Sequence, residues 1–200
     1  MTTVLCDLSE VLIAGLLGVE QQLAPLVSLS GREFLAALAH PSLAELFRGH
    51  ISEETYLSQL VERQGWDLPV EMLKQQIRSN FQRQVEGTLD IVSELAVSYP
   101  VVLVSDHARE WVAYITDVHP FPSLFTRTFY SYEYGYLKRE PEAFRYVLDC
   151  LGTAPEECLL IDDSETNTTV AAGLGIATIR FTTAAALAQQ LAEMGLRRMP

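Results

Sequence analysis

The chain has 200 residues, 48% of them hydrophobic, and its 14 Lys and Arg against 26 Asp and Glu give a formal net charge of −12. A chain of this length and apolar content is too hydrophobic for disorder and folds as one domain, or as one domain with an insertion. The acidic balance, without clustered basic residues, excludes general binding to nucleic-acid backbones. Because the longest apolar run is about half of a membrane span and no signal peptide is visible, we expect a cytoplasmic protein with no membrane partner.

Three cysteines, Cys6, Cys150 and Cys158, are an odd number and lack the spacing of metal ligands. Each stands in an apolar context, so we expect all three to be small buried hydrophobic residues in a reducing compartment. They are therefore expected to contribute to packing and not to chemistry.

Five short apolar runs rich in β-branched residues are typical of strands. They cover residues 4–7, 101–105, 128–132, 158–162 and 177–181. From the second run onward, helical patterns separate the strands or follow the last one. These patterns cover residues 108–118, 142–151, 167–173 and 183–196. The alternation predicts an α/β fold, a Rossmann-like, doubly wound parallel sheet of about five strands.

About 90 residues separate the first predicted strand from the second, far more than a crossover needs, so the chain carries an insertion. Its pattern is helical throughout. The helix-start signals are a capping box at Ser30 and Glu33, another at Ser42 and Glu45, a cap at Ser52, and Asp67 with Pro69. We expect residues 15–86 to form a helical cap subdomain, and residues 1–14 and 87–200 to form the α/β core.

Polar residues stand at or after the ends of four predicted strands. Asp7 ends the first, Ser105 ends the second, Lys138 follows the third, and Asp162 with Asp163 ends the fourth. Taken singly, each has a simpler explanation as a turn residue, a helix cap or a solvated charge. Because the carboxyl ends of parallel strands meet at one edge of a sheet, we expect these residues to converge. Three carboxylates, a hydroxyl and an ammonium suit Mg²⁺ and a phosphoryl group, with one Asp left as a nucleophile.

This set of residues resembles the haloacid dehalogenase-like hydrolases, in the branch with a helical cap inserted after the first motif. The resemblance covers essentially the whole chain, and the stretch RGHISEETYL is most similar to the small sugar-phosphate phosphatases. The matching residues are Asp7 in DLSEVL, Ser105 in VVLVSDH, Lys138 in GYLKREPEAF, and Asp162, Asp163 and Asn167 in IDDSETN. The resemblance implies a Mg²⁺-dependent phosphatase of a small phosphorylated metabolite, acting through an aspartyl-phosphate on Asp7.

The resemblance also implies how the roles divide among the residues. The catalytic residues would be Asp7, Ser105 and Lys138. The ligands of Mg²⁺ would be Asp7, the Ser9 carbonyl, Asp162 and Asp163, the last through water or by holding the others in place. The substrate-binding residues would be Ser9, Glu10, Ser105, Asp106 and Lys138.

One position departs from the family's pattern. Most of its phosphatases carry a second Asp, the general acid and base, two residues after the nucleophile, and this chain has Ser9 there. Because a serine hydroxyl does not titrate usefully near neutral pH, we expect slow hydrolysis of alkyl phosphates, with Glu10 or Asp106 as candidate replacements. Two alternatives stay open: a non-catalytic protein that binds a phosphorylated ligand, and a metal-independent dehalogenase-like hydrolase.

Overall fold

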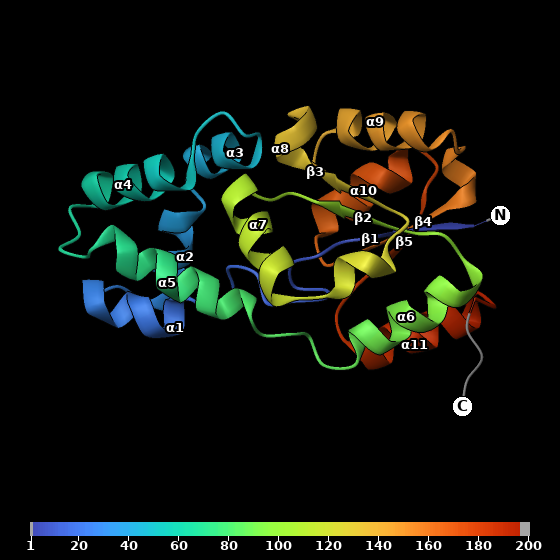
Figure 1. The fold of residues 1–200 in the computed structure, drawn as a ribbon, viewed down its shortest axis with the longest axis horizontal. Helices are drawn as coiled ribbons and strands as arrows, with labels where there is room; N and C mark the ends of the chain where they lie inside the picture. Colours follow the sequence, from blue (N-terminus) through green and yellow to red (C-terminus); the bar gives the residue numbers. More distant parts are fainter. Residues whose placement is uncertain (1, 197–200) are drawn as a thin grey trace.

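A five-stranded parallel sheet forms the centre of the computed structural model, which describes residues 2–196 (Figure 1). The strands are β1 (Thr3–Cys6), β2 (Val101–Ser105), β3 (Arg127–Tyr130), β4 (Cys158–Asp162) and β5 (Ala177–Arg180). They lie in the order β3-β2-β1-β4-β5, and each neighbouring pair is parallel. The predicted α/β fold is therefore confirmed, with the reversal of strand order at β1.

Helices cover both faces of this sheet. On one face lie α6 (Thr88–Ser98), α7 (Arg109–Val118) and α11 (Ala184–Glu193), and on the other lie α9 (Pro141–Leu151) and α10 (Glu165–Gly173). Successive side chains of a strand point to opposite faces, so Val4 and Cys6 pack in the first layer and Leu5 packs in the second. The two layers bury the three central strands β2, β1 and β4 throughout, as is typical of a parallel sheet, whereas the edge strands β3 and β5 are partly exposed.

Strand β3 ends at Tyr130, two residues earlier than the predicted strand, and a short helix, α8 (Ser131–Tyr134), begins there. The last pair between β2 and β3 joins Ser105 to Tyr130. Because β2 ends at that pair, residues 131 and 132 have no strand partner and turn into the helix instead. The strand prediction was wrong for these two residues.

Cys6 and Cys158 are buried, but Cys150 is exposed on α9, so the expectation for Cys150 was wrong. The buried positions of α9 are Ala143, Phe144, Val147 and Leu148. They recur at helical spacing on one face, and this period turns position 150 towards solvent. The apolar neighbours of Cys150 in the sequence suggested burial, because the helical periodicity was not taken into account.

Five helices between β1 and β2 pack together beyond one end of the sheet (Figure 1). They are α1 (Glu20–Leu23), α2 (Gly31–Leu38), α3 (Pro41–Phe47), α4 (Glu53–Gln64) and α5 (Val70–Phe81). We call them the cap; the extent of residues 15–86 as a subdomain stays a prediction. Two predicted helix starts are confirmed: Ser30 forms a capping box with Glu33 at α2, and the Ser52 hydroxyl caps α4.

Two other helix starts differ from the prediction. Helix α3 begins at Pro41, whose fixed φ suits the first helical position, and not after Ser42. His40 is the N-cap, and its Nδ1 accepts a hydrogen bond from the Ser42 N–H at 3.2 Å. Helix α5 begins after Pro69 without any side-chain cap, so Asp67 does not open it.

Two main-chain segments join the cap to the core, and they run side by side. Residues 12–14 and 83–85 form an antiparallel ribbon centred on the bridge between Ile13 and Gln84. Main-chain hydrogen bonds of 2.8 and 2.9 Å flank that bridge. The two links are therefore one hydrogen-bonded unit.

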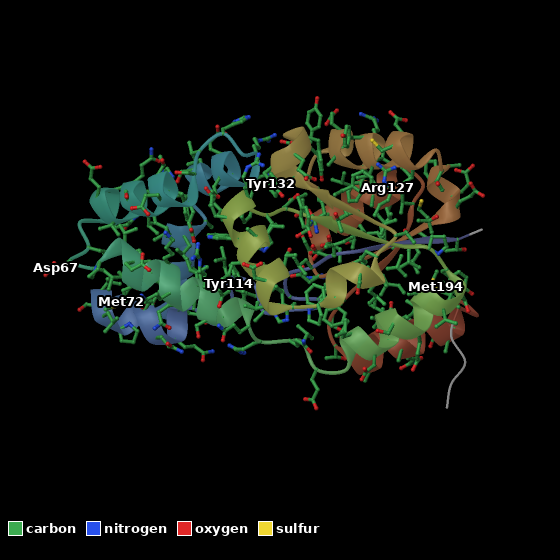
Figure 2. All side chains as sticks on the ribbon, in the orientation of Figure 1. Asp67, Met72, Tyr114, Arg127, Tyr132 and Met194 are labelled. Carbon is green, nitrogen blue, oxygen red and sulfur yellow. The ribbon has the colours of Figure 1, made fainter. Side chains whose placement is uncertain are left out.

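The cap packs against helix α7 of the core. The Trp111 Nε1–H donates to Glu53 Oε1 of α4 at 2.8 Å. Tyr114, labelled in Figure 2, accepts a hydrogen bond from Gln82 at 2.5 Å, and the Arg78 guanidinium lies 5.4 Å from the centroid of its ring. Polar and aromatic contacts thus hold the two parts together beside the edge of the sheet.

Helices α4 and α5 have 12 residues each, whereas a membrane-spanning helix needs about 20 apolar residues. Across residues 2–196, no helix combines the length and the apolar character that crossing a bilayer requires. The cytoplasmic location stays a prediction.

Candidate functional site

The ends of β1 and β4 bring three carboxylates together. In these neighbouring parallel strands Cys6 pairs with Ile161, so Asp7 and Asp162 follow at the same level. The Asp7 N–H continues the ladder by donating to the Ile161 carbonyl at 2.9 Å. With Asp163 they form a group in which one carboxylate oxygen from each residue lies within 4.8 Å of the others.

Lys138 is buried against two of these acids. Its Nζ lies 2.5 Å from Asp7 Oδ1 and 2.7 Å from Asp162 Oδ2, and the residue is 2% exposed. Burial alone would lower the pKa of Lys138, but the carboxylates of Asp162 and Asp7 outweigh it and raise that pKa. The ammonium therefore stays charged and offsets part of the repulsion between the acids.

One positive charge does not balance three carboxylates. Burial raises the pKa of Asp7 well above its usual range; Lys138 opposes this shift and Asp162 adds to it. Burial and the neighbouring Asp162 also raise the pKa of Asp163. Closely spaced carboxylate oxygens are the donors that Mg²⁺ prefers, and a divalent cation would stabilise their ionised forms. The residues present fit Mg²⁺.

Asp162 is fully buried, and its carboxylate is held by three donors. Its Oδ1 accepts from the Ser164 N–H at 2.9 Å, and Asn167 Nδ2 lies 3.1 and 3.2 Å from its two oxygens. Lys138 is the third donor. Ser164 is also the N-cap of α10, so the start of that helix fixes the orientation of the acid.

Strand β2 ends with Ser105, whose buried hydroxyl has no hydrogen-bond partner within residues 2–196. A buried hydroxyl without a partner is uncommon in folded proteins and is costly unless a ligand or water pairs with it. Asp106 follows, and both of its carboxylate oxygens accept from the Lys138 N–H at 3.1 Å. Asp106 therefore ties the end of β2 to the loop that carries Lys138.

The Ser9 hydroxyl, in the loop after β1, is engaged by His107. Ser9 Oγ lies 3.2 Å from His107 Nε2. The imidazole is buried, with ring contacts to Phe47, Phe81 and Trp111. Burial lowers the pKa of His107 to about 3, so the ring is neutral. Sequence reasoning missed this pair, since 98 residues separate its members.

Glu10 has a φ of 62°, a left-handed conformation that residues other than glycine rarely adopt. Its Oε1 accepts from the N–H groups of Gly15 and Leu17 at 2.9 and 3.1 Å. Asn80 of α5 secures the same loop by donating to the carbonyls of Gly15 and Leu17 at 2.7 and 2.8 Å. The Glu10 carboxylate thus fastens the first link between core and cap.

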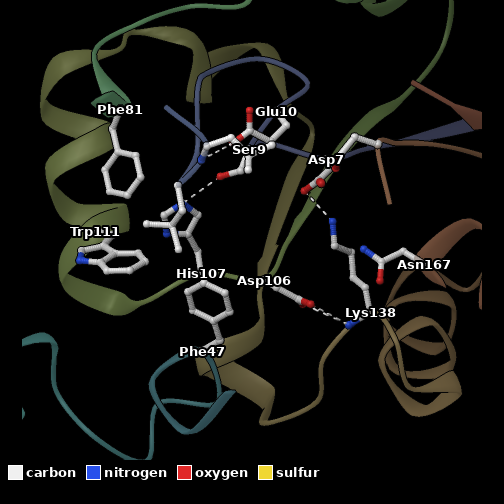
Figure 3. A pocket seen from close by; sticks show the side chains of 13 residues that line it. Asp7, Ser9, Glu10, Phe47, Phe81, Asp106, His107, Trp111, Lys138 and Asn167 are labelled. Atoms are coloured by element: carbon white, nitrogen blue, oxygen red, sulfur yellow. Dashed lines mark hydrogen bonds and ion pairs between the residues drawn. The ribbon is translucent and has the colours of Figure 1, made fainter. Parts of the chain in front are cut away.

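A cavity of about 260 Å³ opens at the carboxyl edge of the sheet (Figure 3). The sequence-predicted residues in its lining are Asp7, Ser9, Glu10, Asp106, Lys138 and Asp163. Ser105 and Asp162 are buried and take no part in the lining. Phe47 and Phe81 of the cap and Trp111 of α7 complete an aromatic wall, which no sequence motif pointed to.

A second, larger cavity of about 620 Å³ adjoins the first. Its lining includes eight cap residues between positions 39 and 48, Asp106 after β2, Leu137 and Arg139 in the segment after α8, and Ser164, Thr166 and Asn167 at the start of α10. Phe47, Asp106 and Asn167 line both cavities, so these three residues mark the place where the two meet.

No family model matches the chain. Among curated proteins, it is 27% identical over 157 residues to flavin mononucleotide hydrolase 1 of Arabidopsis thaliana, covering 78% of this chain and 64% of that protein. It is also 27% identical over 142 residues to D-ribitol-5-phosphate phosphatase of Bacteroides thetaiotaomicron, covering 68% of this chain and 69% of that protein. The chain thus spans somewhat less than two thirds of the first relative's length.

A crystal structure of a HAD family enzyme from Bacteroides thetaiotaomicron, in complex with magnesium and inorganic phosphate, has the same fold. It superposes with a TM-score of 0.72 at 24% identity, covering 92% of this chain and 95% of that one. The similarity to that enzyme extends over the sheet and the inserted helices, since nearly the whole of both chains is covered. The fold is that of HAD family enzymes, and the relatives of the chain include a flavin mononucleotide hydrolase and a sugar-phosphate phosphatase.

Proposed function

We propose that the protein is a Mg²⁺-dependent phosphatase of a small phosphorylated metabolite and acts through an aspartyl-phosphate on Asp7. The observation that carries this proposal is the charge arrangement around Asp7, where one buried ammonium and two further carboxylates share the edge of the sheet. The two curated relatives are named for the hydrolysis of a flavin nucleotide and of a ribitol phosphate, which supports a phosphorylated substrate.

In this mechanism the carboxylate of Asp7 attacks phosphorus, and an alcohol leaves. Lys138, already in contact with Asp7, would neutralise charge that develops on the phosphoryl oxygens. A phosphoryl oxygen beside Asp7 would also give the unpaired Ser105 hydroxyl a partner. Water then hydrolyses the aspartyl-phosphate and releases Asp7 for another turnover.

The residues that would hold Mg²⁺ are Asp7, Asp162 and the main-chain carbonyl of Ser9, with Asp163 acting through a water molecule. When bound, Mg²⁺ supplies positive charge to the phosphoryl oxygens and relieves repulsion among the acids. Asp7 needs this help because its burial favours the neutral carboxyl, which is a poor nucleophile.

The second candidate function is non-catalytic binding of a phosphorylated ligand. The hydroxyl at Ser9 favours it, because the group that usually transfers protons is absent and the hydroxyl is engaged by His107. A metal-independent dehalogenase-like hydrolase is less compatible with the structure, since such an enzyme has no need of three clustered carboxylates.

The proposal is tested with a panel of phosphorylated metabolites and 4-nitrophenyl phosphate, each assayed with Mg²⁺ and with a chelator. We expect Mg²⁺-dependent release of phosphate, reduced by at least about 10³-fold in Asp7→Asn. Asp90→Asn, at an exposed position of α6, is the matched control and should leave the rate unchanged. Phosphate-ester binding without turnover would identify a binding protein, and chelator-resistant release of halide from 2-haloacids would identify a dehalogenase.

A further inference from the structure

The proposed phosphatase requires a proton donor for its leaving oxygen, and position 9 does not provide one. Ser9 carries a hydroxyl, which is held 3.2 Å from the buried imidazole of His107. An alkoxide leaving group is a strong base, so protonation by a positioned side chain accelerates its departure by about 10²–10⁴-fold. Another group in the cavity has to take this role if alkyl phosphates are substrates.

Four carboxylates line the first cavity, and three of them are engaged elsewhere. Asp7 is the nucleophile of the proposed reaction, and Asp163 belongs to the acidic group that fits Mg²⁺. Glu10 fastens the loop that leads to the cap and lines only the first cavity, whereas Asp106 lines both cavities. Asp106 remains.

The position of Asp106 suits contact with the leaving group. The first cavity, of about 260 Å³, holds the nucleophile, and a larger cavity of about 620 Å³ is open next to it. The rest of a substrate would therefore extend from the first cavity into the second. The boundary between them is formed by Phe47, Asp106 and Asn167, so the ester oxygen would pass beside the Asp106 carboxylate (Figure 3).

Asp106 is also held rigidly enough to act there. Both of its oxygens accept from the Lys138 N–H at 3.1 Å, and Figure 3 shows the carboxylate between Phe47 and Lys138. Each carboxylate oxygen has a second lone pair, which this contact leaves available. Lys138 contacts both acids: its main-chain N–H binds Asp106, and its ammonium lies against Asp7. The position of Asp106 relative to the ammonium beside Asp7 is therefore fixed.

We propose that Asp106 is the general acid and base that stands in for the carboxylate absent at position 9. This assignment rests on the proposed phosphatase function. In the first step Asp7 forms a bond to phosphorus, the bond from phosphorus to the ester oxygen breaks, and the Asp106 carboxyl gives its proton to that oxygen. In the second step water attacks phosphorus, the Asp106 carboxylate takes the water's proton, and phosphate leaves Asp7 free.

The surroundings of Asp106 are compatible with both protonation states. Burial raises the pKa of Asp106 to about 6, and the charge and N–H of Lys138 oppose the shift. The other charged or titratable groups that face it are Asp162, Arg139, Arg48 and Tyr134. A carboxyl that titrates near neutral pH can give a proton in one step and accept one in the next.

Comparison of two leaving groups tests the assignment in the intact protein with Mg²⁺. We expect Asp106→Asn to lower kcat/KM for glycerol 1-phosphate by 10²-fold or more, and that for 4-nitrophenyl phosphate by less than about fivefold, because nitrophenolate leaves without a proton. The amide keeps an acceptor for the Lys138 N–H, so the tie between the two loops persists. Asp90→Asn is the control and should change neither rate.

The ratio of the two rates decides the matter, because partial misfolding of a variant lowers both rates equally. An equal loss on both substrates in Asp106→Asn would mean that Asp106 only positions Lys138, and would overturn the assignment. In the parent, the rate on the alkyl phosphate should also fall at high pH, where Asp106 has lost its proton. Asp106→Asn should remove this pH dependence. If the variant kept the pH profile of the parent, the assignment of Asp106 would likewise be contradicted. Failure of the proposed function itself is distinct: then the parent hydrolyses neither ester and Asp7→Asn has no effect.

Discussion

Ser9 stands where most phosphatases of the superfamily carry a carboxylate, and its contact with His107 shows that the change is accommodated locally. We expect Ser9→Asp to raise the alkyl-phosphate rate by less than about tenfold in the parent, where Asp106 already serves, and by 10²-fold or more in an Asp106→Asn background. Steady-state rates on glycerol 1-phosphate for the four combinations check this. Equal gains in both backgrounds would show that the two positions act independently.

Glu10 lines the first cavity, and its carboxylate also holds the loop that leads to the cap. Its carboxylate is half-buried, and burial raises its pKa, while the N–H groups of Leu17 and Gly15 oppose the shift. We expect Glu10→Gln to reduce the free energy of unfolding by about 1–2 kcal/mol, because hydrogen bonds to a charged acceptor are weakened, without changing the alkyl-to-aryl rate ratio. Urea denaturation and the two assays measure this.

Glu86→Gln, at an exposed position near the second link, is the matched control for Glu10→Gln and should be neutral in both measurements. A selective loss of alkyl-phosphate activity in Glu10→Gln, with unchanged stability, would assign the proton transfer to Glu10 and not to Asp106.

At the scale of elements, the contact between α4 and α7 joins cap and core. Glu53 is buried, and its carboxylate accepts from Trp111 Nε1 at 2.8 Å and from Arg78 at 2.7 Å. We expect Trp111→Phe to lower the free energy of unfolding by about 1–3 kcal/mol, because it leaves an oxygen of the buried carboxylate without its donor. Trp66→Phe, which alters a ring stacked on Phe34 within the cap, should cost less. If denaturant titrations gave equal losses of unfolding free energy for Trp111→Phe and Trp66→Phe, the hydrogen bond between Trp111 and Glu53 would not be the cause.

The strands and the strand-end residues were predictable because their signals are local. A buried parallel strand reads as an apolar run, and the sheet itself brings the residues at strand ends together, as with Asp7 and Asp162. Two cap helices, starting after Ser30 and Ser52, were found from capping residues within four positions. The start of α3 was missed because Pro41 takes the first helical position, with His40 as the N-cap. The prediction considered only the capping box at Ser42.

What the sequence did not reveal depends on contacts between distant residues. The hydrogen bond between Ser9 and His107 joins the loops that follow the neighbouring strands β1 and β2, and nothing in either loop alone predicts it. The same holds for the aromatic wall, because Phe47 and Trp111 are read from sequence only as apolar helix positions. Cavities arise from how the cap and core meet, which is a property of packing and not of any motif.

At the scale of the whole molecule, the group formed by Asp7, Asp162 and Asp163 links stability to the cations in solution. We expect millimolar Mg²⁺ to raise the melting temperature, because binding to the folded state stabilises it by mass action. When the Mg²⁺ concentration is 100 times Kd, the free energy of unfolding rises by about 2.7 kcal/mol. Asp162→Asn should remove most of this effect, since it deletes one carboxylate of the group. Because the net charge of −12 attracts cations in general, scans at matched ionic strength in NaCl are the baseline. Equal stabilisation of parent and Asp162→Asn would place the cation elsewhere.

The ribbon formed by residues 12–14 and 83–85 means that the chain departs from the core and returns to it at a single point. The segment between these two stretches is an insertion whose two ends lie side by side, whatever its length or shape. A different set of helices could be spliced in at Ile13 and Gln84 without rerouting any strand of the sheet. The inserted helices are therefore a unit that could be exchanged, while Asp7, Ser105, Lys138 and Asp162 would keep their connectivity.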